Sequence, residues 1–295
     1  DSNYLNNILK DYKIVLLENI RFYKEEEKKD MKFVKKISSF GDLFINECFS
    51  CCHRNHSSIA GIPSYLPSFP GKLLEEEILN LKNLILSSST ENNIAVLGGA
   101  KISTKLKIID FYAKNYSKVI IGGAMANTFL LALGNEIGES LHEKKMVKTA
   151  KDLILIYGDK LLLPKDVVVT SKKDPSIVIT KTLSEIEKSH VIMDIGPQTR
   201  MLFYNEILKT KTILWNGPLG LFERKPYDEG TTFVLQAIKA NKIKNFFSVA
   251  GGGDTISILN QASCFDDFSF VSTGGGAFLE FIQGALMPGL TSLND

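Results

Sequence analysis

The 295-residue chain has little of several features that mark specialised classes of protein. Its four cysteines are too few for the disulfide framework of a secreted domain, and they favour a reducing compartment. Its net charge of +2 argues against the concentrated basic face of a nucleic-acid binder. No apolar run approaches the roughly 18 residues of a membrane span, and the polar stretch from Asp1 to Lys10 predicts no signal peptide. These absences favour a cytoplasmic protein without nucleic-acid or membrane partners.

Short apolar runs of strand-forming residues alternate with amphipathic, helix-like stretches. The expected strands cover residues 14–17, 43–45, 94–97, 119–121, 161–163, 167–169, 212–215, 246–250 and 268–272. The expected helices cover residues 104–114, 125–133, 144–157, 231–241 and 278–283. Most of the strands are apolar on both faces, which predicts an α/β fold of parallel sheets covered by helices. Right-handed crossovers then place the carboxyl ends of the strands on one edge of each sheet.

A domain boundary is expected where turn-forming residues over 61–71 precede a stretch with helical apolar spacing over 72–85. We expect a first lobe over residues 1–70, a connecting helix over 71–88, a second lobe over 89–283 and a C-terminal return segment over 284–295. The charged run Lys24 to Asp30 (KEEEKKD) is expected to be a solvated loop or helix face.

Five of the expected strands end in glycine-rich turns, and most of these turns open a helix. They are Gly98–Lys101 (GGAK), Gly122–Met125 (GGAM), Asn216–Gly220 (NGPLG), Gly251–Thr255 (GGGDT) and Gly274–Ala277 (GGGA). Glycine lets backbone N–H groups approach an anion, and a helix N-terminus favours negative charge. Five such turns on one edge would line a single groove, which predicts a site for a phosphate-bearing ligand. Neither a Walker-type phosphate loop nor a dinucleotide fingerprint is present.

Three charged residues accompany these turns. Lys101 and Lys105 lie four positions apart at a helix start, so both side chains can face the same turn. A lysine is unfavourable near a helix N-terminus, and a bound anion would resolve that conflict. Asp254 follows three glycines, and two interpretations stay open for it: a helix N-cap, or a ligand of Mg²⁺.

Cysteine and histidine are concentrated in the stretch Asn46 to Ser58 (NECFSCCHRNHSS). A haem-attachment motif is excluded, because Phe49 stands where the first cysteine of C-x-x-C-H would be needed before Cys52. A zinc site would use Cys48, Cys51, His53 and His56, and their spacing is tighter than in known structural zinc sites.

Eight motifs in unbroken order resemble phosphoglycerate kinase. Besides the glycine-rich turns GGAK and GGGDT, they are Leu16–Phe22 (LLENIRF), Cys52–Ser58 (CHRNHSS), Gly122–Phe129 (GGAMANTF), Asp194–Pro197 (DIGP), Trp215–Glu223 (WNGPLGLFE) and Ser272–Ala277 (STGGGA). In this family small residues usually occupy the positions of the three clustered cysteines, and cysteine is small enough to replace them. The resemblance implies two Rossmann-like lobes joined by a helix, the first of them incomplete.

The resemblance implies a glycolytic, Mg²⁺-dependent phosphotransferase that moves a phosphoryl group reversibly from 1,3-bisphosphoglycerate to ADP, giving 3-phosphoglycerate and ATP. It implies small-molecule substrates and a monomer. The positions that match the family's 3-phosphoglycerate site are Arg21, His53 and Arg54. Those that match catalytic positions are Lys101, Gly275 and Gly276. Those that match the nucleotide site are Gly99, Lys105, Gly123, Leu141, Asn216, Pro218, Glu223, Gly252, Gly253, Asp254 and Thr255, with Asp254 also the Mg²⁺ contact.

The chain departs from the family at its N-terminus. The family's first lobe opens with an Arg-x-Asp-x-Asn strand, and nothing in these residues matches it. We therefore expect a partial chain that binds nucleotide but is impaired in phosphoryl transfer. The alternative is a non-catalytic nucleotide-binding remnant, and the coding sequence upstream of Asp1 distinguishes the two. A metal-binding module would instead contain stoichiometric zinc.

Overall fold

The computed structural model describes residues 2–87 and 92–293. Its contacts divide the chain into two compact units. One unit comprises Asp1–Lys82 with Thr273–Asp295, and the other comprises Asn83–Ser272. Residues 273–283 are thus grouped with the first unit, whereas the second lobe expected from the sequence, residues 89–283, includes them. The functional boundaries of the lobes stay a prediction.

The first unit consists mainly of short helices. They are α1 (Ser2–Asp11), α2 (Lys24–Glu27), α3 (Met31–Ser38), most of α4 (Lys72–Ser87), α11 (Gly276–Ile282) and α12 (Pro288–Thr291), with single helical turns at Ile20–Phe22, Phe49–Cys51, Ser57–Gly61 and Ile62–Ser64. Two short strands, β1 (Phe44–Asn46) and β2 (Ser68–Pro70), pair in parallel. Helix α12 is tied to this unit by two hydrogen bonds. Gly289 N–H donates to the Cys52 carbonyl (2.9 Å), and Asn46 Nδ2 donates to the Gly289 carbonyl (3.1 Å).

One expectation for the first unit is wrong, and a second holds with one exception. Residues 14–17 form no strand, and Ile14 and Leu16 are 87% and 96% exposed. A strand needs a neighbour, and no described strand pairs with this segment. The run Lys24 to Asp30 is mostly exposed and begins with helix α2, as expected, and Glu26 is the exception. Glu26 is buried, and its carboxylate accepts hydrogen bonds from Ser58 N–H (3.0 Å) and Ser58 Oγ (2.6 Å). These bonds replace those that the carboxylate would make with water.

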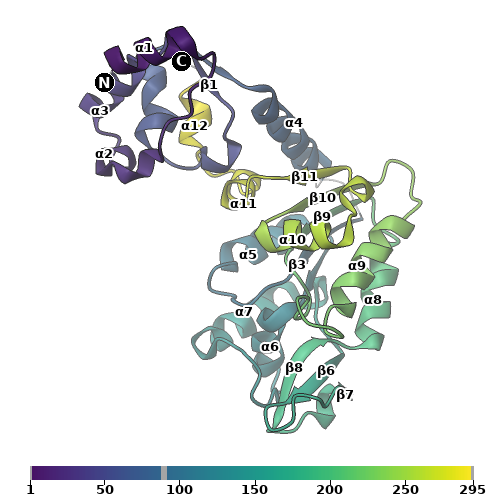
Figure 1. The fold of residues 1–295 in the computed structure, drawn as a ribbon. Coiled ribbons are helices and arrows are strands. Elements are labelled where there is room, and N and C mark those ends of the chain that lie inside the picture. Colours follow the sequence, from purple (N-terminus) through teal and green to yellow (C-terminus); the bar gives the residue numbers. More distant parts are fainter. Residues whose placement is uncertain (1, 88–91, 294–295) are drawn as a thin grey trace. The chain divides into compact units, whose positions relative to one another are not determined.

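The second unit is built on a six-stranded sheet in the order β11-β10-β9-β3-β4-β5. Figure 1 labels β11, β10, β9 and β3. The strands are β3 (Asn93–Leu97), β4 (Lys118–Ile121), β5 (Leu161–Leu162), β9 (Thr212–Asn216), β10 (Phe247–Gly251) and β11 (Phe270–Ser272). Every neighbouring pair is parallel, so all carboxyl ends meet at one edge. The helices of this unit are α5 (Leu106–Asn115), α6 (Gly123–Ala132), α7 (Val147–Tyr157), α8 (Pro197–Ile207), α9 (Glu229–Ala240) and α10 (Gly253–Ala262).

A separate sheet in the second unit was not anticipated. Strands β6 (Asp166–Ser171), β7 (Ile179–Thr182) and β8 (His190–Ile195) form an antiparallel sheet in the order β7-β6-β8. Every residue of β6 is buried, as Val167 and Val169 pack into a small core with Leu130 of α6. An antiparallel strand buried on both faces looks like a parallel one in sequence, which is why residues 167–169 were assigned to a parallel sheet.

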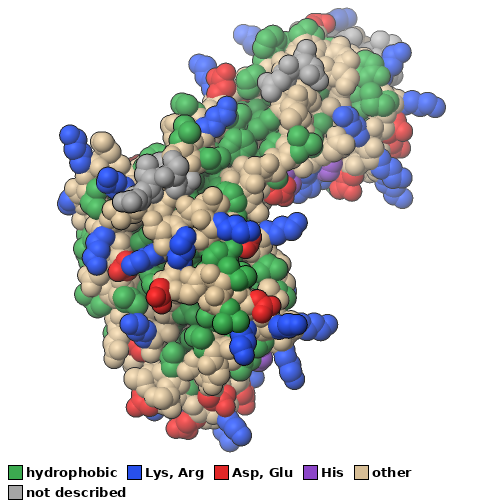
Figure 2. Space-filling model, turned by 180° about the vertical axis from the view of Figure 1, so that it is seen from behind, with side chains coloured by type: hydrophobic (Ala, Val, Ile, Leu, Met, Phe, Trp, Pro, Cys, Tyr) green, Lys and Arg blue, Asp and Glu red, His purple; other side chains and the backbone are tan. Residues whose placement is uncertain are grey.

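The main core lies in the second unit and contains the chain's single tryptophan. Trp215 is fully buried and stacks on Phe268, with ring centroids 6.0 Å apart and planes 22° apart. On the face drawn in Figure 2, Lys and Arg side chains are interspersed with Asp and Glu. Within residues 2–87 and 92–293, no helix is long and apolar enough to cross a membrane.

Candidate functional site

The glycine-rich turns after β3, β4 and β9 are pressed together at the carboxyl edge of the six-stranded sheet. Gly99 N–H donates to the Pro218 carbonyl (3.1 Å), and Gly123 N–H donates to the Leu219 carbonyl (2.9 Å). A side chain at Gly98 would place its Cβ 1.9 Å from the Pro218 carbonyl oxygen. Only glycine therefore permits this close backbone approach, and these turns line one edge as the sequence predicts.

Lys105 lies at the centre of this edge, immediately before α5. Its Nζ donates to the Gly98 carbonyl (2.7 Å) and to Asn216 Oδ1 (2.7 Å), and it lies 3.3 Å from the Asn216 carbonyl. Burial lowers the pKa of Lys105 to about 8, and the charge of Asp254 opposes that shift. Lys105 is therefore a partly buried ammonium group, held in place by neutral acceptors at the ends of β3 and β9.

The turn after β10 adds the N-terminus of helix α10. Gly252 is the N-cap residue with φ +100°, and a Cβ there would lie 2.4 Å from Asn216 Nδ2. Thr255 Oγ1 accepts a hydrogen bond from Gly217 N–H (2.8 Å), which joins this turn to the turn after β9. The first N–H groups of an α-helix have no partner within the helix, and a Cβ added at Gly253 would meet no heavy atom within 4 Å. The start of α10 thus offers backbone donors beside open space.

Asp254 is exposed in the first turn of α10. Because Gly252 is the N-cap residue, the N-cap interpretation of Asp254 is wrong. Within the described part of the chain, no three His, Cys, Asp or Glu side chains cluster closely enough to hold a metal ion. Mg²⁺ nevertheless commonly uses one or two carboxylates together with substrate phosphates and water. A single carboxylate beside an anion site fits that coordination.

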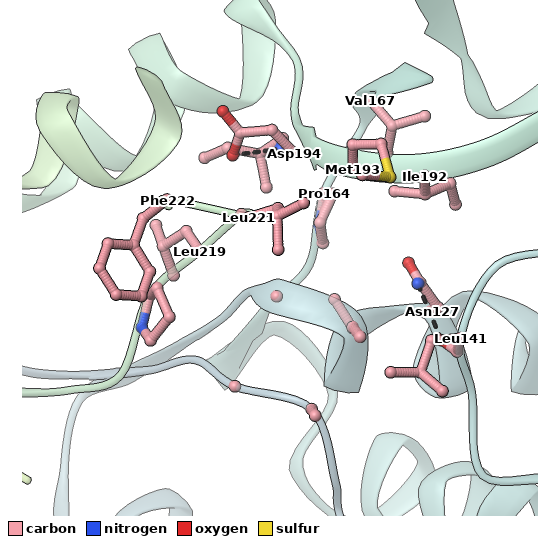
Figure 3. Close-up of a pocket in the computed structure, with 18 of the residues that line it drawn as sticks. Asn127, Leu141, Pro164, Val167, Ile192, Met193, Asp194, Leu219, Leu221 and Phe222 are labelled. Carbon is pink, nitrogen blue, oxygen red and sulfur yellow. Dashed lines mark hydrogen bonds between the residues drawn. The ribbon is translucent and has the colours of Figure 1, made fainter. Parts of the chain in front are cut away.

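A cavity of about 330 Å³ adjoins the glycine-rich turns (Figure 3). Six of the residues assigned to the nucleotide site line it, namely Gly99, Gly123, Leu141, Pro218, Glu223 and Asp254. Its other walls are mostly apolar, and Asn127 Nδ2 donates to the Leu141 carbonyl at one end (3.0 Å). The cavity offers an apolar slot that opens toward backbone amides and charged groups, as sites for flat ring systems do.

Sequence reasoning missed several lining residues of this cavity. Ile192 and Met193 belong to β8, which was not predicted, and Phe222 lies inside a motif from which only Asn216, Pro218 and Glu223 were assigned to the site. Asp194 also lines the cavity; its carboxylate accepts from Gly230 N–H (2.7 Å) and Ile195 N–H (2.8 Å). Burial raises the pKa of Asp194 to about 7, although these hydrogen bonds oppose the shift. The motif Asp194–Pro197 was the only signal that marked this wall.

The first unit brings together the three residues assigned to the phosphoglycerate site. Arg21 Nη2 lies 3.8 Å from Cys51 Sγ, and Arg54 N–H donates to the Cys51 carbonyl (2.9 Å). His53 Nδ1 and Arg54 Nε are buried, and among the described residues neither has a hydrogen-bond partner. Buried polar atoms are rarely left unpaired, so this turn presents donors suited to a ligand.

Comparison with known proteins decides the family. The sequence model of the family named phosphoglycerate kinase matches residues 2–285. The chain belongs to the phosphoglycerate kinase family. Phosphoglycerate kinase of Dictyoglomus turgidum is 42% identical over 291 residues, covering 97% of this chain and 73% of that protein. Phosphoglycerate kinase of Orientia tsutsugamushi (strain Ikeda) is 42% identical over 292 residues, covering 97% and 71%.

Solved phosphoglycerate kinases have the same fold. The structure from Coxiella burnetii gives a TM-score of 0.85 at 33% identity and covers 95% of this chain and 72% of that one. The structure from Pyrococcus horikoshii gives 0.82 at 31% identity, covering 94% and 72%. The predicted fold class and the predicted enzyme class, a phosphotransferase with a carboxyl group as acceptor, are therefore confirmed at the level of the family.

Three residues of this chain match catalytic positions of the phosphoglycerate kinase family, and they do not all lie in the same unit. Lys101 is exposed in the loop before α5, in the second unit. Gly275, with φ +55°, and Gly276 begin α11 in the first unit. Their catalytic roles stay a prediction.

Proposed function

We propose that this chain binds Mg·ADP and Mg·ATP at the carboxyl edge of the six-stranded sheet, and that it acts in reversible phosphoryl transfer between 1,3-bisphosphoglycerate and ADP. The observation that supports this most strongly is Lys105. The charge of Asp254 offsets only part of the effect of burial on the pKa of Lys105, and among the described residues none of the hydrogen-bond partners of its ammonium group supplies a negative charge. The phosphates of a nucleotide would supply one.

The nucleotide's parts have matching surroundings along this edge. The adenine and ribose would occupy the apolar cavity beside Leu141 and Pro218, with Glu223 accepting from the ribose hydroxyls. The phosphates would lie between Lys105 and the N-terminus of α10, at Gly252, Gly253 and Thr255. Gly99, Gly123 and Asn216 would shape that pocket through their backbone contacts.

Asp254 would hold Mg²⁺ together with phosphate oxygens and water. When bound, the ion would neutralise charge on the phosphates of the nucleotide. Lys105 would also neutralise charge on the phosphates. Its ammonium group is already fixed by Gly98 and Asn216, so it needs little reorganisation.

The acid substrate would bind in the first unit. Arg21 and Arg54 present guanidinium groups that match the geometry of phosphate and carboxylate oxygens. The unpaired Nε of Arg54 and Nδ1 of His53 support this assignment, because an anion would satisfy them. Transfer itself needs no covalent enzyme intermediate. Lys101 and the start of α11 at Gly275 and Gly276 would stabilise the moving phosphoryl group.

For the 295 residues by themselves, we propose that phosphoryl transfer is impaired while nucleotide binding is retained. The proposed acid site has Arg21, His53 and Arg54, and the Arg-x-Asp-x-Asn strand of the family has no counterpart in these residues. A coupled assay measures ATP formation from 1,3-bisphosphoglycerate. Turnover at the rate typical of kinases, about 1–100 s⁻¹, would contradict impairment. Little or no turnover with intact binding of Mg·ADP is the expected result.

Calorimetry with Mg·ADP tests the nucleotide site directly. Lys105→Ala should weaken binding at least about tenfold, since a hydrogen bond to a charged group contributes roughly 1.5–3 kcal/mol. Lys107→Ala is the matched control, because Lys107 is exposed on the same helix and should bind as the parent chain does. No heat with the folded parent chain, or equal affinities for all three proteins, would overturn the proposal.

We further propose that the protein is cytoplasmic and monomeric. The low cysteine content and the family's small-molecule chemistry support this.

A further inference from the structure

Two of the clustered cysteines form a C-x-x-C pair (CFSC) at a tight turn of the first unit. Cys48 is the N-cap of the helical turn Phe49–Cys51, and Cys51 N–H donates to the Cys48 carbonyl (3.0 Å). Such a turn keeps its first and fourth Cα atoms within about 7 Å. A disulfide needs a Cα separation of about 4.4–6.8 Å. The backbone therefore already holds the two residues within bonding reach.

The same two cysteines are the accessible ones. Cys48 and Cys51 are half-buried, whereas Cys52 and Cys264 are buried. Burial raises the pKa of the Cys52 thiol to about 12, so Cys52 stays protonated and unreactive near neutral pH. Disulfide exchange requires a thiolate that a reagent can reach. Of the chain's four thiols, this leaves the pair at the turn.

Neighbouring groups distinguish the two thiols and set the order in which they react. Burial, followed by a side-chain hydrogen bond with Cys48, raises the pKa of the Cys51 thiol. Cys51 therefore retains its proton and donates it toward the Cys48 sulfur, which also lies 3.3 Å from Ser50 Oγ. A protonated thiol is a poor nucleophile, so we assign Cys51 as the second sulfur to react and Cys48 as the first.

We propose that Cys48 and Cys51 form a dithiol–disulfide site that exchanges with small-molecule disulfides such as oxidised glutathione. The Cys48 thiolate attacks one sulfur of the reagent, forms a mixed disulfide and releases one thiolate. Cys51 then loses its proton and attacks the Cys48 sulfur, which closes the Cys48–Cys51 bond and releases the second thiolate. The protein loses two electrons and two protons, and the reagent is reduced to two thiols.

This inference does not rest on the proposed function. It concerns a site next to Arg21, whose Nη2 lies 3.8 Å from Cys51 Sγ, but its chemistry can be read without substrate or turnover.

The test is intact-mass spectrometry and peptide mapping of the full chain after incubation with oxidised glutathione. The parent chain should lose the mass of two hydrogen atoms, and the digest should locate the bond between Cys48 and Cys51. Reduced glutathione in excess should reverse the change. A bond that involves Cys52, or four free thiols in folded protein when the urea-unfolded chain is oxidised, would overturn the proposal.

Single variants test the order of attack. Cys51→Ser should accumulate a stable mixed disulfide on Cys48, because the second thiol is gone. Cys48→Ser should react at least about tenfold more slowly, since the protonated thiol is a poor nucleophile. Cys264→Ser is the control and should form the same intramolecular bond as the parent chain. Equal rates for Cys48→Ser and Cys51→Ser, with unchanged circular dichroism spectra, would contradict the assignment of Cys48 as the attacking residue.

Discussion

At the scale of single residues, Lys105 carries the clearest functional signal. A lysine near a helix N-terminus is disfavoured by the helix dipole, and this one is also partly buried, which lowers its pKa to about 8. The unfolded chain binds its proton up to the ordinary pKa of about 10.4. Near pH 7 the folded state therefore carries a destabilising charge. Such a cost is typical of a binding site that is completed by an anion.

The first residue-scale prediction concerns pH. The ammonium form of Lys105 binds the nucleotide phosphates, so affinity for Mg·ADP should be highest below about pH 8 and should fall as pH rises through it. The decrease should approach tenfold per pH unit until the higher pKa of the nucleotide complex is reached. The contribution of Lys105 to stability has the opposite sign, because deprotonation between about pH 8 and 10 removes the buried charge.

Calorimetry between pH 7 and 9.5 checks this dependence, with Lys105→Ala as the reference that lacks the titrating group. The ratio of the two affinities should shrink as pH rises. A ratio that stays constant over that range would show that Lys105 does not titrate in the free protein or does not contact the phosphates.

Residue identities alone do not reveal burial within a charged run. Glu26 stands among six other charged residues, and its sequence neighbours argue for solvent. Its partner, Ser58, lies 32 positions away along the chain, and only the folded backbone brings the two together.

At the scale of elements, the sequence predicts the parts whose pattern is local. The six-stranded sheet and its glycine-rich turns follow from short apolar runs, most of which end in glycine, and helix α4 follows from helical apolar spacing. The antiparallel sheet does not follow from such runs, because β7 is mostly exposed and β8 mixes polar and apolar residues. Five residues that line the cavity, Val191 to Ile195, lie on β8, and the periodicity of the sequence does not predict that part of the site.

The element-scale prediction concerns the start of α3. Asp30 is its N-cap, and Oδ1 accepts hydrogen bonds from Lys32 N–H (2.9 Å) and Phe33 N–H (3.0 Å). Asp30→Ala should lower the free energy of unfolding of the first unit by about 1 kcal/mol. Urea unfolding followed by circular dichroism measures the change.

The control for this prediction is Asp42→Ala, which removes an exposed carboxylate in the loop before β1 and should change stability by less than about 0.5 kcal/mol. Affinity for Mg·ADP should be unchanged in both variants, because the nucleotide site is assigned to the second unit. Equal destabilisation by the two substitutions would show that the cap contributes nothing specific.

At the scale of the whole molecule, the two units differ in how much of their apolar surface is buried. The second unit contains the large core around Trp215. The first unit has a two-stranded sheet and exposes several large apolar side chains, among them Ile14, Leu16 and Phe22. Exposed apolar area contributes nothing to stability, so the first unit should unfold at lower denaturant concentration than the second.

Each unit contains its own probe of unfolding, which makes this last prediction testable. The single tryptophan, Trp215, and the buried thiol of Cys264 report on the second unit, and the buried thiol of Cys52 reports on the first. In urea, Cys52 should become reactive to a pulse of alkylating agent before Trp215 fluorescence changes.

Mg·ADP at 100 times its dissociation constant should stabilise the second unit by about 2.7 kcal/mol. It should therefore shift the Trp215 and Cys264 transitions together and leave the Cys52 transition in place. A single transition that moves as a whole would mean that the two units unfold as one, and the nucleotide would then stabilise the acid-binding residues as well.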